Sequence, residues 1–225
     1  MNLFDIMGPI MVGPSSSHTA GAARIGRVAR SLLGEEPREA ELRLHGSFAS
    51  TGKGHGTHQA LIAGLLGLAP DDPRLPDSFR LAEERGLRFT FDTCTIRDAH
   101  PNSVLIRVTG KSGRTVEMGG ASLGGGRVRV FEVDGMACTF SGELPTLVIH
   151  NTDQPGCVSH AAGALAQGGV NVATLQLNRG SRGGLAVMVI ECDKAVPPQV
   201  VEEIRSLKAI QRVTCYIPEG QEATA

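Results

Sequence analysis

The stretch "TLVIHNTDQPGCVSHAAGALAQGGVNVATLQLNR", residues 146–179, decides the fold of the C-terminal part of this chain. Two short runs with strand-like composition flank a segment with helical spacing. Residues 184–217 then supply a further strand, a helix and a last strand, in that order. The pattern predicts a βαββαβ unit, which is the ferredoxin-like arrangement.

The expected helix ends agree with this assignment. Pro197 and Pro198 stand where the second helix would begin, and proline is tolerated there because the first N–H groups of a helix need no partner within it. Gly168 and Gly169 follow the first helix, where a left-handed cap is expected. Local turn chemistry and hydrophobic spacing therefore predict the same boundaries.

The residues before Gly142 have a less regular pattern that still predicts a mixed α/β domain ending in antiparallel strands. We place a domain boundary near Gly142, which divides the chain into residues 1–142 and 143–225 and makes it α+β overall. The N-terminal pattern predicts helices near 17–33, 57–68 and 78–85, and strands near 40–48, 87–93, 103–110, 114–120 and 126–135.

Length and charge exclude several classes of protein. The 225 residues can bury a real core and favour two domains. A net charge of -1 leaves no basic excess for nucleic acid, so we expect no such partner. No apolar run approaches the roughly 18 residues of a membrane span, and the first residues lack the basic region of a signal peptide. We therefore expect a cytoplasmic protein with no membrane partner.

Cysteine usage argues against two further kinds of site. The five cysteines are odd in number, widely spaced and without a Cys-x-x-Cys pair. This spacing is unlike a disulfide framework or a self-contained metal or iron–sulfur site. We expect buried free thiols and no metal ligands at Cys94, Cys138, Cys157, Cys192 and Cys215.

A polar stretch, "GPSSSHTAGAARIGR", covers residues 13–27. Ser15, Ser16 and Ser17 precede a helical pattern, so one of them is a natural N-cap. The remaining hydroxyls, Thr19 and the free N–H groups of the first turn would form a donor-rich surface suited to a carboxylate or phosphate. A redundant cap in a serine-rich turn is the alternative interpretation.

A second polar loop, "HGSFASTGKGHGTHQA" at residues 45–60, also precedes a helix. Because a second loop rich in Ser, Thr and His is present, His18 becomes a candidate for moving a proton near neutral pH. The alternative is that His18 is only an exposed histidine. A flexible glycine turn with a Thr57 cap is the alternative for the loop itself. The sequence has neither a phosphate-loop motif nor a nucleophile elbow, so nucleotide binding is weakly supported and we discount hydrolase chemistry.

These motifs, with "FDIMGPIMVGPSSSHTAGAARIGRVARSLLG", "HGSF", "KGHGT", "HPNS" and "SLGGG", resemble the β subunit of bacterial iron–sulfur-dependent L-serine dehydratases. The resemblance implies an α-subunit partner whose own cysteines hold a [4Fe-4S] cluster. One open iron of that cluster would act as a Lewis acid on the hydroxyl of L-serine, giving aminoacrylate and then pyruvate and ammonia. The lack of a cysteine cluster here fits that division of labour.

The same resemblance assigns roles to single residues. Ser15, Ser16, Ser17 and Thr19 would bind the carboxylate and hydroxyl of serine, with His18 as a candidate acid or base. Further candidates in the same cleft are His45, Ser47, His55 and Thr57. After "KGHGT" many relatives would carry an acidic residue, whereas this chain has His58, so no role is carried over to position 58.

The C-terminal part resembles ACT amino-acid sensors, which often pair through their sheets and bind an amino acid at the interface. The matching effector positions are Asn151, Asp153, Gly156 and Asn171. A helix N-terminus suits the carboxylate of an amino acid, and Asp153 with the Asn amides suits its ammonium group. Serine or a related amino acid is the expected effector, and homodimerisation through this domain is expected; a fold kept only for dimerisation is the alternative.

A different class of function also fits. The chain could be a non-catalytic amino-acid-binding regulatory module, because its N-terminal part resembles the allosteric substrate-binding domain of some phosphoglycerate dehydrogenases. Activity with an α chain separates the two hypotheses.

Overall fold

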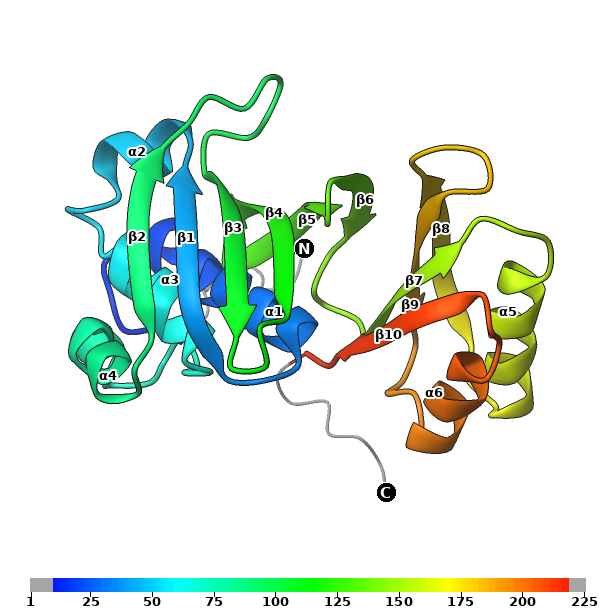
Figure 1. Ribbon diagram of the computed structural model, residues 1–225. Coiled ribbons are helices and arrows are strands. Elements are labelled where there is room, and N and C mark those ends of the chain that lie inside the picture. The colour runs from blue at the N-terminus through cyan, green and yellow to red at the C-terminus, as the bar shows by residue number, and fades with distance from the viewer. Residues whose placement is uncertain (1–9, 219–225) are drawn as a thin grey trace, which may run out of the picture. The chain divides into compact units, whose positions relative to one another are not determined.

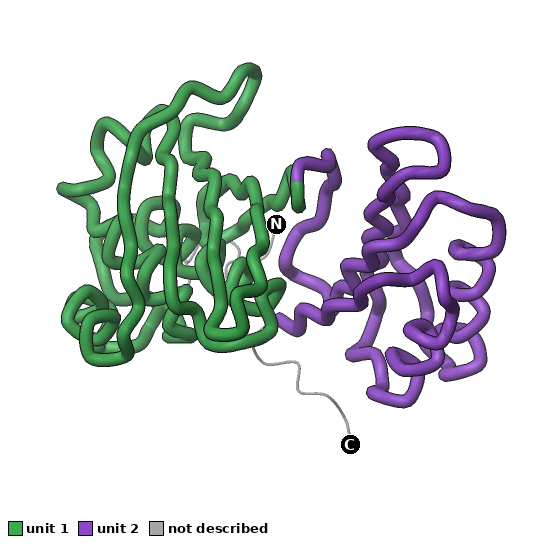
Figure 2. The backbone as a smooth tube through the Cα atoms, in the orientation of Figure 1, with its two compact units in different colours: residues 1–134 green, residues 135–225 purple. Residues whose placement is uncertain are grey.

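The computed structural model describes residues 10–218, and the chain forms two compact units, Met1–Asp134 and Gly135–Ala225 (Figure 2). The boundary between family domains near Gly142 stays a prediction. The compact units divide earlier because strand β6, Met136–Phe140, belongs with unit 2. Within that unit the backbone N–H of Thr139 donates to Gln176 Oε1 at 3.1 Å, and Gln176 Nε2 donates back to the Thr139 carbonyl at 2.9 Å. This strand was not expected from the sequence.

A twisted sheet forms one layer of unit 1, with strand order β2-β1-β3-β4-β5 (Figure 1). β1 and β2 are parallel, and the other pairs are antiparallel. The inward side chains of β1 alternate with exposed ones, as expected for a sheet covered on one face. The strands are β1 Pro37–Leu44, β2 Arg88–Thr93, β3 Ser103–Gly110, β4 Thr115–Gly124 and β5 Arg127–Val133.

Helices form the second layer of unit 1. α1 packs on α3 and on the sheet, and Gly26 and Gly64 face each other where the two helices cross. A Cβ at Gly64 would lie 2.0 Å from the Ala23 carbonyl oxygen, so the close approach requires glycine. The elements are a π-helical turn η2 Ser16–Gly21, α1 Ala22–Leu33, α2 Gly46–Thr51, α3 Thr57–Leu65, the short 3-10 helix η3 Leu75–Asp77 and α4 Ser78–Glu84.

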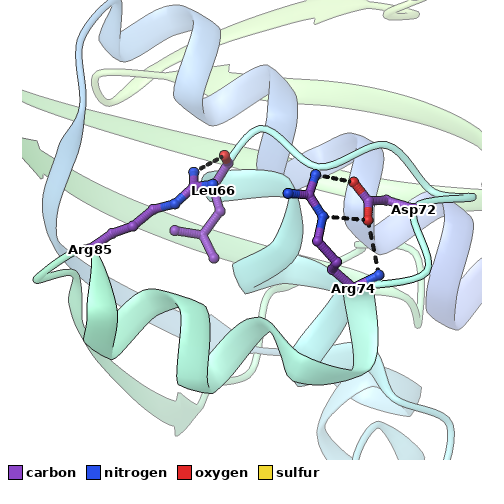
Figure 3. Close-up of polar contacts among 4 residues, drawn as sticks. All are labelled: Leu66, Asp72, Arg74 and Arg85. Atoms are coloured by element: carbon purple, nitrogen blue, oxygen red, sulfur yellow. Dashed lines mark hydrogen bonds and ion pairs between the residues drawn. The ribbon is translucent and has the colours of Figure 1, made fainter.

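Two arginines hold the connection between α3 and α4 (Figure 3). Arg85 donates to the Leu66 carbonyl at 3.0 Å, just past the end of α3. Arg74 donates to both carboxylate oxygens of Asp72, at 2.9 and 2.6 Å, and this pairing lowers the pKa of Asp72 to about 2. These contacts position α4 beside α3.

Two expectations for the second polar loop were wrong. The strand predicted over 40–48 ends at Leu44, and residues 46–51 form α2 instead. Gly46 has φ 56, which turns the chain, and the Ser47 N–H then donates to the Pro101 carbonyl at 2.8 Å. The N-cap of α3 is Gly56, with φ 75, so Thr57 is the first helical residue and does not cap.

Unit 2 confirms the βαββαβ prediction. Its four-stranded antiparallel sheet has the order β10-β7-β9-β8, and both helices cover one face (Figure 1). Leu147, Ile149, Leu165 and Met188 are fully buried in the core between the layers. The elements are β7 Thr146–Thr152, α5 Cys157–Gln167, β8 Val172–Arg179, β9 Leu185–Cys192, α6 Pro198–Arg205 and β10 Ile210–Tyr216.

The helix-end predictions in unit 2 are also confirmed. Pro198 is the first residue of α6, and Gly169 adopts the left-handed conformation after α5, with φ 64. All five cysteines are free, but only Cys138, Cys157 and Cys192 are buried as expected, whereas Cys94 and Cys215 are half-buried. Among residues 10–218, no helix is both long and apolar enough to cross a membrane.

Candidate substrate site around His18

The first helical turn is built on Ser15. Its Oγ accepts the His18 N–H at 3.3 Å and its carbonyl accepts the Thr19 N–H at 2.8 Å, which confirms that one of the three serines is the N-cap. The turn is π-helical, an uncommon geometry that occurs often at functional sites. It lies so close to β4 that a Cβ on Gly21 would be 2.0 Å from Ser122 Oγ. The start of α1 is therefore held against the sheet.

The ring of His18 joins two parts of the chain. Its Nδ1 lies 3.2 Å from Ser17 Oγ and 3.4 Å from Ser15 Oγ. Its Nε2 lies 3.1 Å from Ser47 Oγ and 3.2 Å from Thr51 Oγ1, both on α2. Because a hydroxyl can donate or accept, these contacts satisfy either neutral tautomer of the imidazole. We call these five residues the His18 cluster.

The surroundings of His18 favour its neutral form. Burial lowers the pKa of His18, the nearby His55 lowers it further, and the backbone of Ser47 partly offsets both. The His55 ring centroid is 5.0 Å from that of His18, and the Phe48 ring packs edge-on at 5.4 Å. A neutral imidazole with rotatable hydroxyl partners can take up a proton at either nitrogen.

The "KGHGT" loop is tied to the π-helical turn by Thr19. This residue is 1% exposed, and its hydroxyl donates to the His55 carbonyl at 3.2 Å. Thr57 is fully buried, and its hydroxyl has no hydrogen-bond partner within residues 10–218. Thr19 thus ties the loop to the turn that carries His18, and Ser16 in the same turn is half-buried.

His45 lies apart from the cluster. Its Nδ1 accepts the Ile96 N–H at 3.2 Å, so the ring faces the loop that follows β2. The structure therefore brings Ser15, Ser17, Ser47 and His55 to His18. It also adds Thr51, which the sequence interpretation missed: its spacing from Ser47 is informative only if α2 is recognised as a helix.

Comparisons with known proteins place this chain in a family. A family model described as "Serine dehydratase beta chain" matches residues 2–84, and an "ACT domain" model matches residues 146–209. The chain is 40% identical over 213 residues to the "Probable L-serine dehydratase, beta chain" of Bacillus subtilis, covering 95% of this chain and 96% of that protein. This chain belongs to the L-serine dehydratase β-chain family.

Two further relatives of this β chain are informative. The "L-serine dehydratase, beta chain" of Peptoniphilus asaccharolyticus is 41% identical over 192 residues, which is 85% of this chain and 86% of that one. The "D-3-phosphoglycerate dehydrogenase" of Bacillus subtilis is 23% identical over 198 residues, covering 85% of this chain but 36% of that protein. The chain is thus similar to L-serine dehydratase β chains over most of their length, and to a phosphoglycerate dehydrogenase over about a third of its length.

The ACT domain places three of the four predicted effector positions at one end of its sheet. Asn151 is 1% exposed, and its Oδ1 has no hydrogen-bond partner in the part of the chain that the structure describes. Asp153 Oδ2 accepts from the Gly183 N–H at 3.0 Å and from Arg179 at 2.8 Å, and these bonds lower its pKa. Gly156, with φ 100, is the N-cap of α5.

Asn171 lies at the opposite end of the same sheet. It directly precedes β8, whose first residue pairs with Cys192 of β9, while Thr152 at the end of β7 pairs with Leu185 at the start of β9. Its Nδ2 donates to Asp193 Oδ2 at 2.6 Å. A single ACT domain therefore does not bring Asn171 to the other three positions.

Proposed function

We propose that this β chain is a subunit of an L-serine dehydratase (L-serine ammonia-lyase) that converts L-serine to pyruvate and ammonia with an α-subunit partner. The observation that carries the proposal is the His18 cluster. One buried, neutral imidazole is contacted at both nitrogens by hydroxyls, from η2 and its N-cap on one side and from α2 on the other. Family membership supplies the substrate, because the two relatives that match over most of both sequences are named for L-serine.

The chemistry assigned to this chain is binding and proton handling. The carboxylate of serine would bind at the N-terminus of the π-helical turn, beside Ser16 and Ser17, its first two residues. The neutral His18 accepts a proton from the substrate at one ring nitrogen, after the substrate has displaced the hydroxyl that contacts this nitrogen. Ser47 and Thr51 then hold the ring in place by hydrogen bonds at Nε2.

The residues of this chain do not fit an iron–sulfur cluster. Its five cysteines lie singly along the chain and are all free. Residues 10–218 contain no group of three or more His, Cys, Asp or Glu side chains that could hold a metal ion. The [4Fe-4S] cluster of the family therefore belongs on the α subunit in this proposal, and no step of the chemistry above passes through it.

Reconstitution tests the catalytic role. The full β chain is co-expressed with an α chain that carries cluster cysteines, and pyruvate formation from L-serine is followed anaerobically. His18→Ala should lower kcat/KM by about 10²- to 10⁴-fold, the usual contribution of a general acid or base. Ser47→Ala should lower it by up to about tenfold, since one of the two hydroxyl partners of Nε2 is lost. Ser50→Ala, at an exposed position on the same helix, is the matched control and should behave as wild type.

The proposal extends to regulation through the ACT domain. Asn171 and the Asp153 end of the sheet could contact one amino acid only if two copies of the domain pair. β8 is the edge strand of its sheet, and all of its side chains are exposed or half-buried, which suits pairing with a second copy. A homodimer joined through this domain would bind L-serine, or a related amino acid, at the interface.

The alternative is a non-catalytic amino-acid-binding regulatory module. The similarity to a phosphoglycerate dehydrogenase over 85% of this chain favours it. Full activity of the reconstituted pair with both His18→Ala and Ser16→Ala would support the alternative and reject the catalytic role. Loss of activity with His18→Ala, but not with Ser50→Ala, would reject the alternative.

A further inference from the structure

A groove in unit 1 opens on the other side of α2 from the His18 cluster. We propose that it binds a small monocarboxylate with an apolar tail, such as an aromatic amino or 2-oxo acid. The groove has a volume of about 800 Å³, within the range of small-molecule sites. Its wall includes Ala49, Lys53, His58, Phe79, Phe91 and Asp92.

The groove and the His18 cluster are separate sites. Ser47 and Thr51 point to His18, whereas Ala49 and Lys53 of the same segment line the groove. No residue of the His18 cluster lines the groove. The inference therefore does not depend on the proposed dehydratase function.

An aromatic wall provides the apolar part. The Phe79 ring centroid lies 4.9 Å from that of Phe89 and 6.3 Å from that of Phe91, and Phe79 is 36% exposed. The chain has seven phenylalanines and no tryptophan, so three of its few large rings stand together here. β2 is the edge strand, and the short helix α4 leaves these rings partly open to solvent. A ligand that covers them gains from removing apolar surface from water.

Lys53 provides a charge for the head group. It is exposed and forms no ion pair or hydrogen bond among the described residues, so it is a cation without a counter-ion at the edge of an apolar groove. Its complement is an anion that sits beside the aromatic wall. A carboxylate on an apolar tail meets both requirements.

Two further groups narrow the ligand to a single negative charge. Burial lowers the pKa of His58, the nearby Lys53 ammonium lowers it further, and the Gly52 backbone only partly offsets these effects, so His58 adds no second cation. Its Nδ1 is buried without a hydrogen-bond partner within residues 10–218, and its ring packs against Phe91 at 4.3 Å. Asp92 lines the same groove and would repel a second anionic group. A dicarboxylate or a phosphate is therefore disfavoured.

Direct binding to the full β chain tests this inference. Phenylpyruvate and L-phenylalanine are titrated separately and followed by isothermal calorimetry and ligand-observed NMR. We expect saturable binding of at least one probe and none of acetate, which lacks the tail, or of benzyl alcohol, which lacks the charge. Preference for L-phenylalanine would indicate that Asp92 contacts the ammonium group, and preference for phenylpyruvate that it does not; both results support the site.

Variants locate the binding. Lys53→Gln and Phe79→Ala should each weaken it by at least about tenfold, with circular dichroism to show that Phe79→Ala folds. Lys208→Gln, at an exposed lysine of unit 2, is the matched control and should bind as wild type. Excess L-serine should not displace the probe, which separates this site from the His18 cluster. Absence of saturable binding by both probes, or unchanged affinity in Lys53→Gln, would overturn the inference.

Discussion

The crossing of α1 and α3 allows a prediction that links stability to the site. Gly64→Ala adds a Cβ that would lie 2.0 Å from the Ala23 carbonyl oxygen, 2.8 Å from the Arg27 nitrogen and 2.9 Å from the Gly26 Cα. All three are backbone atoms, so no side-chain rotation can relieve the overlap. The two helices must move apart along their contact.

The size of the effect follows from two opposing contributions. Overpacking a close-packed core usually costs about 1–3 kcal/mol, and a clash between backbones belongs at the upper end of that range. Replacing a glycine within a helix by alanine contributes about 1 kcal/mol in the opposite direction. The free energy of unfolding should therefore fall by about 2 kcal/mol. Gly163→Ala in α5 is the matched control, because its Cβ would meet nothing within 4 Å, and it should stabilise by about 0.5–1 kcal/mol.

Urea unfolding followed by far-UV circular dichroism measures both variants, since the chain has no tryptophan and one tyrosine to report by fluorescence. η2 continues directly into α1, so a displaced α1 should also move His18 and lower the activity of the reconstituted pair beyond any loss of folded protein. Gly64→Ala with a stability equal to or above that of wild type would refute the reasoning. The same would be true if both substitutions shifted stability by the same amount in the same direction.

Three further predictions concern stability and regulation. Folding lowers the pKa values of His18 and His58 below 6.5. The unfolded chain therefore binds more protons than the folded chain just below that pH. The stability due to these two neutral histidines should be complete above pH 6.5 and should be lost as the pH falls through their folded pKa values. As the pH is lowered, the urea midpoint of His58→Phe should fall less steeply than that of the wild-type chain. The same dependence on pH in both proteins would contradict this prediction. Arg85→Met removes the bond to Leu66 and should lower the unfolding free energy by about 1 kcal/mol, measured by urea titration. Asn171→Ala should shift the serine dependence of activity while turnover at saturation is kept; an unchanged curve would reject the effector role.

Local sequence determined the C-terminal unit almost completely. Alternating strands, helical spacing and the glycine and proline residues at the helix ends act over a few neighbouring residues, and they predicted all six elements of the βαββαβ unit. β6 was missed, and the polar contacts that hold it within unit 2 come from the Gln176 side chain, 37 residues along the chain. Contacts between residues so far apart in the sequence are not reflected in the local pattern, so the sequence did not predict this strand.

The candidate site shows the same division. The sequence by itself identified two polar loops, each before a helix, and the serine N-cap. Only the tertiary structure decided which hydroxyls meet His18, because Ser47 and Thr51 reach it across 29 and 33 residues. The helix that carries them exists because the Pro101 carbonyl, about fifty residues away, accepts the Ser47 N–H after the turn at Gly46. Local propensity indicates where a helix can begin, but for α2 the backbone carbonyl of the distant Pro101 determines where it begins.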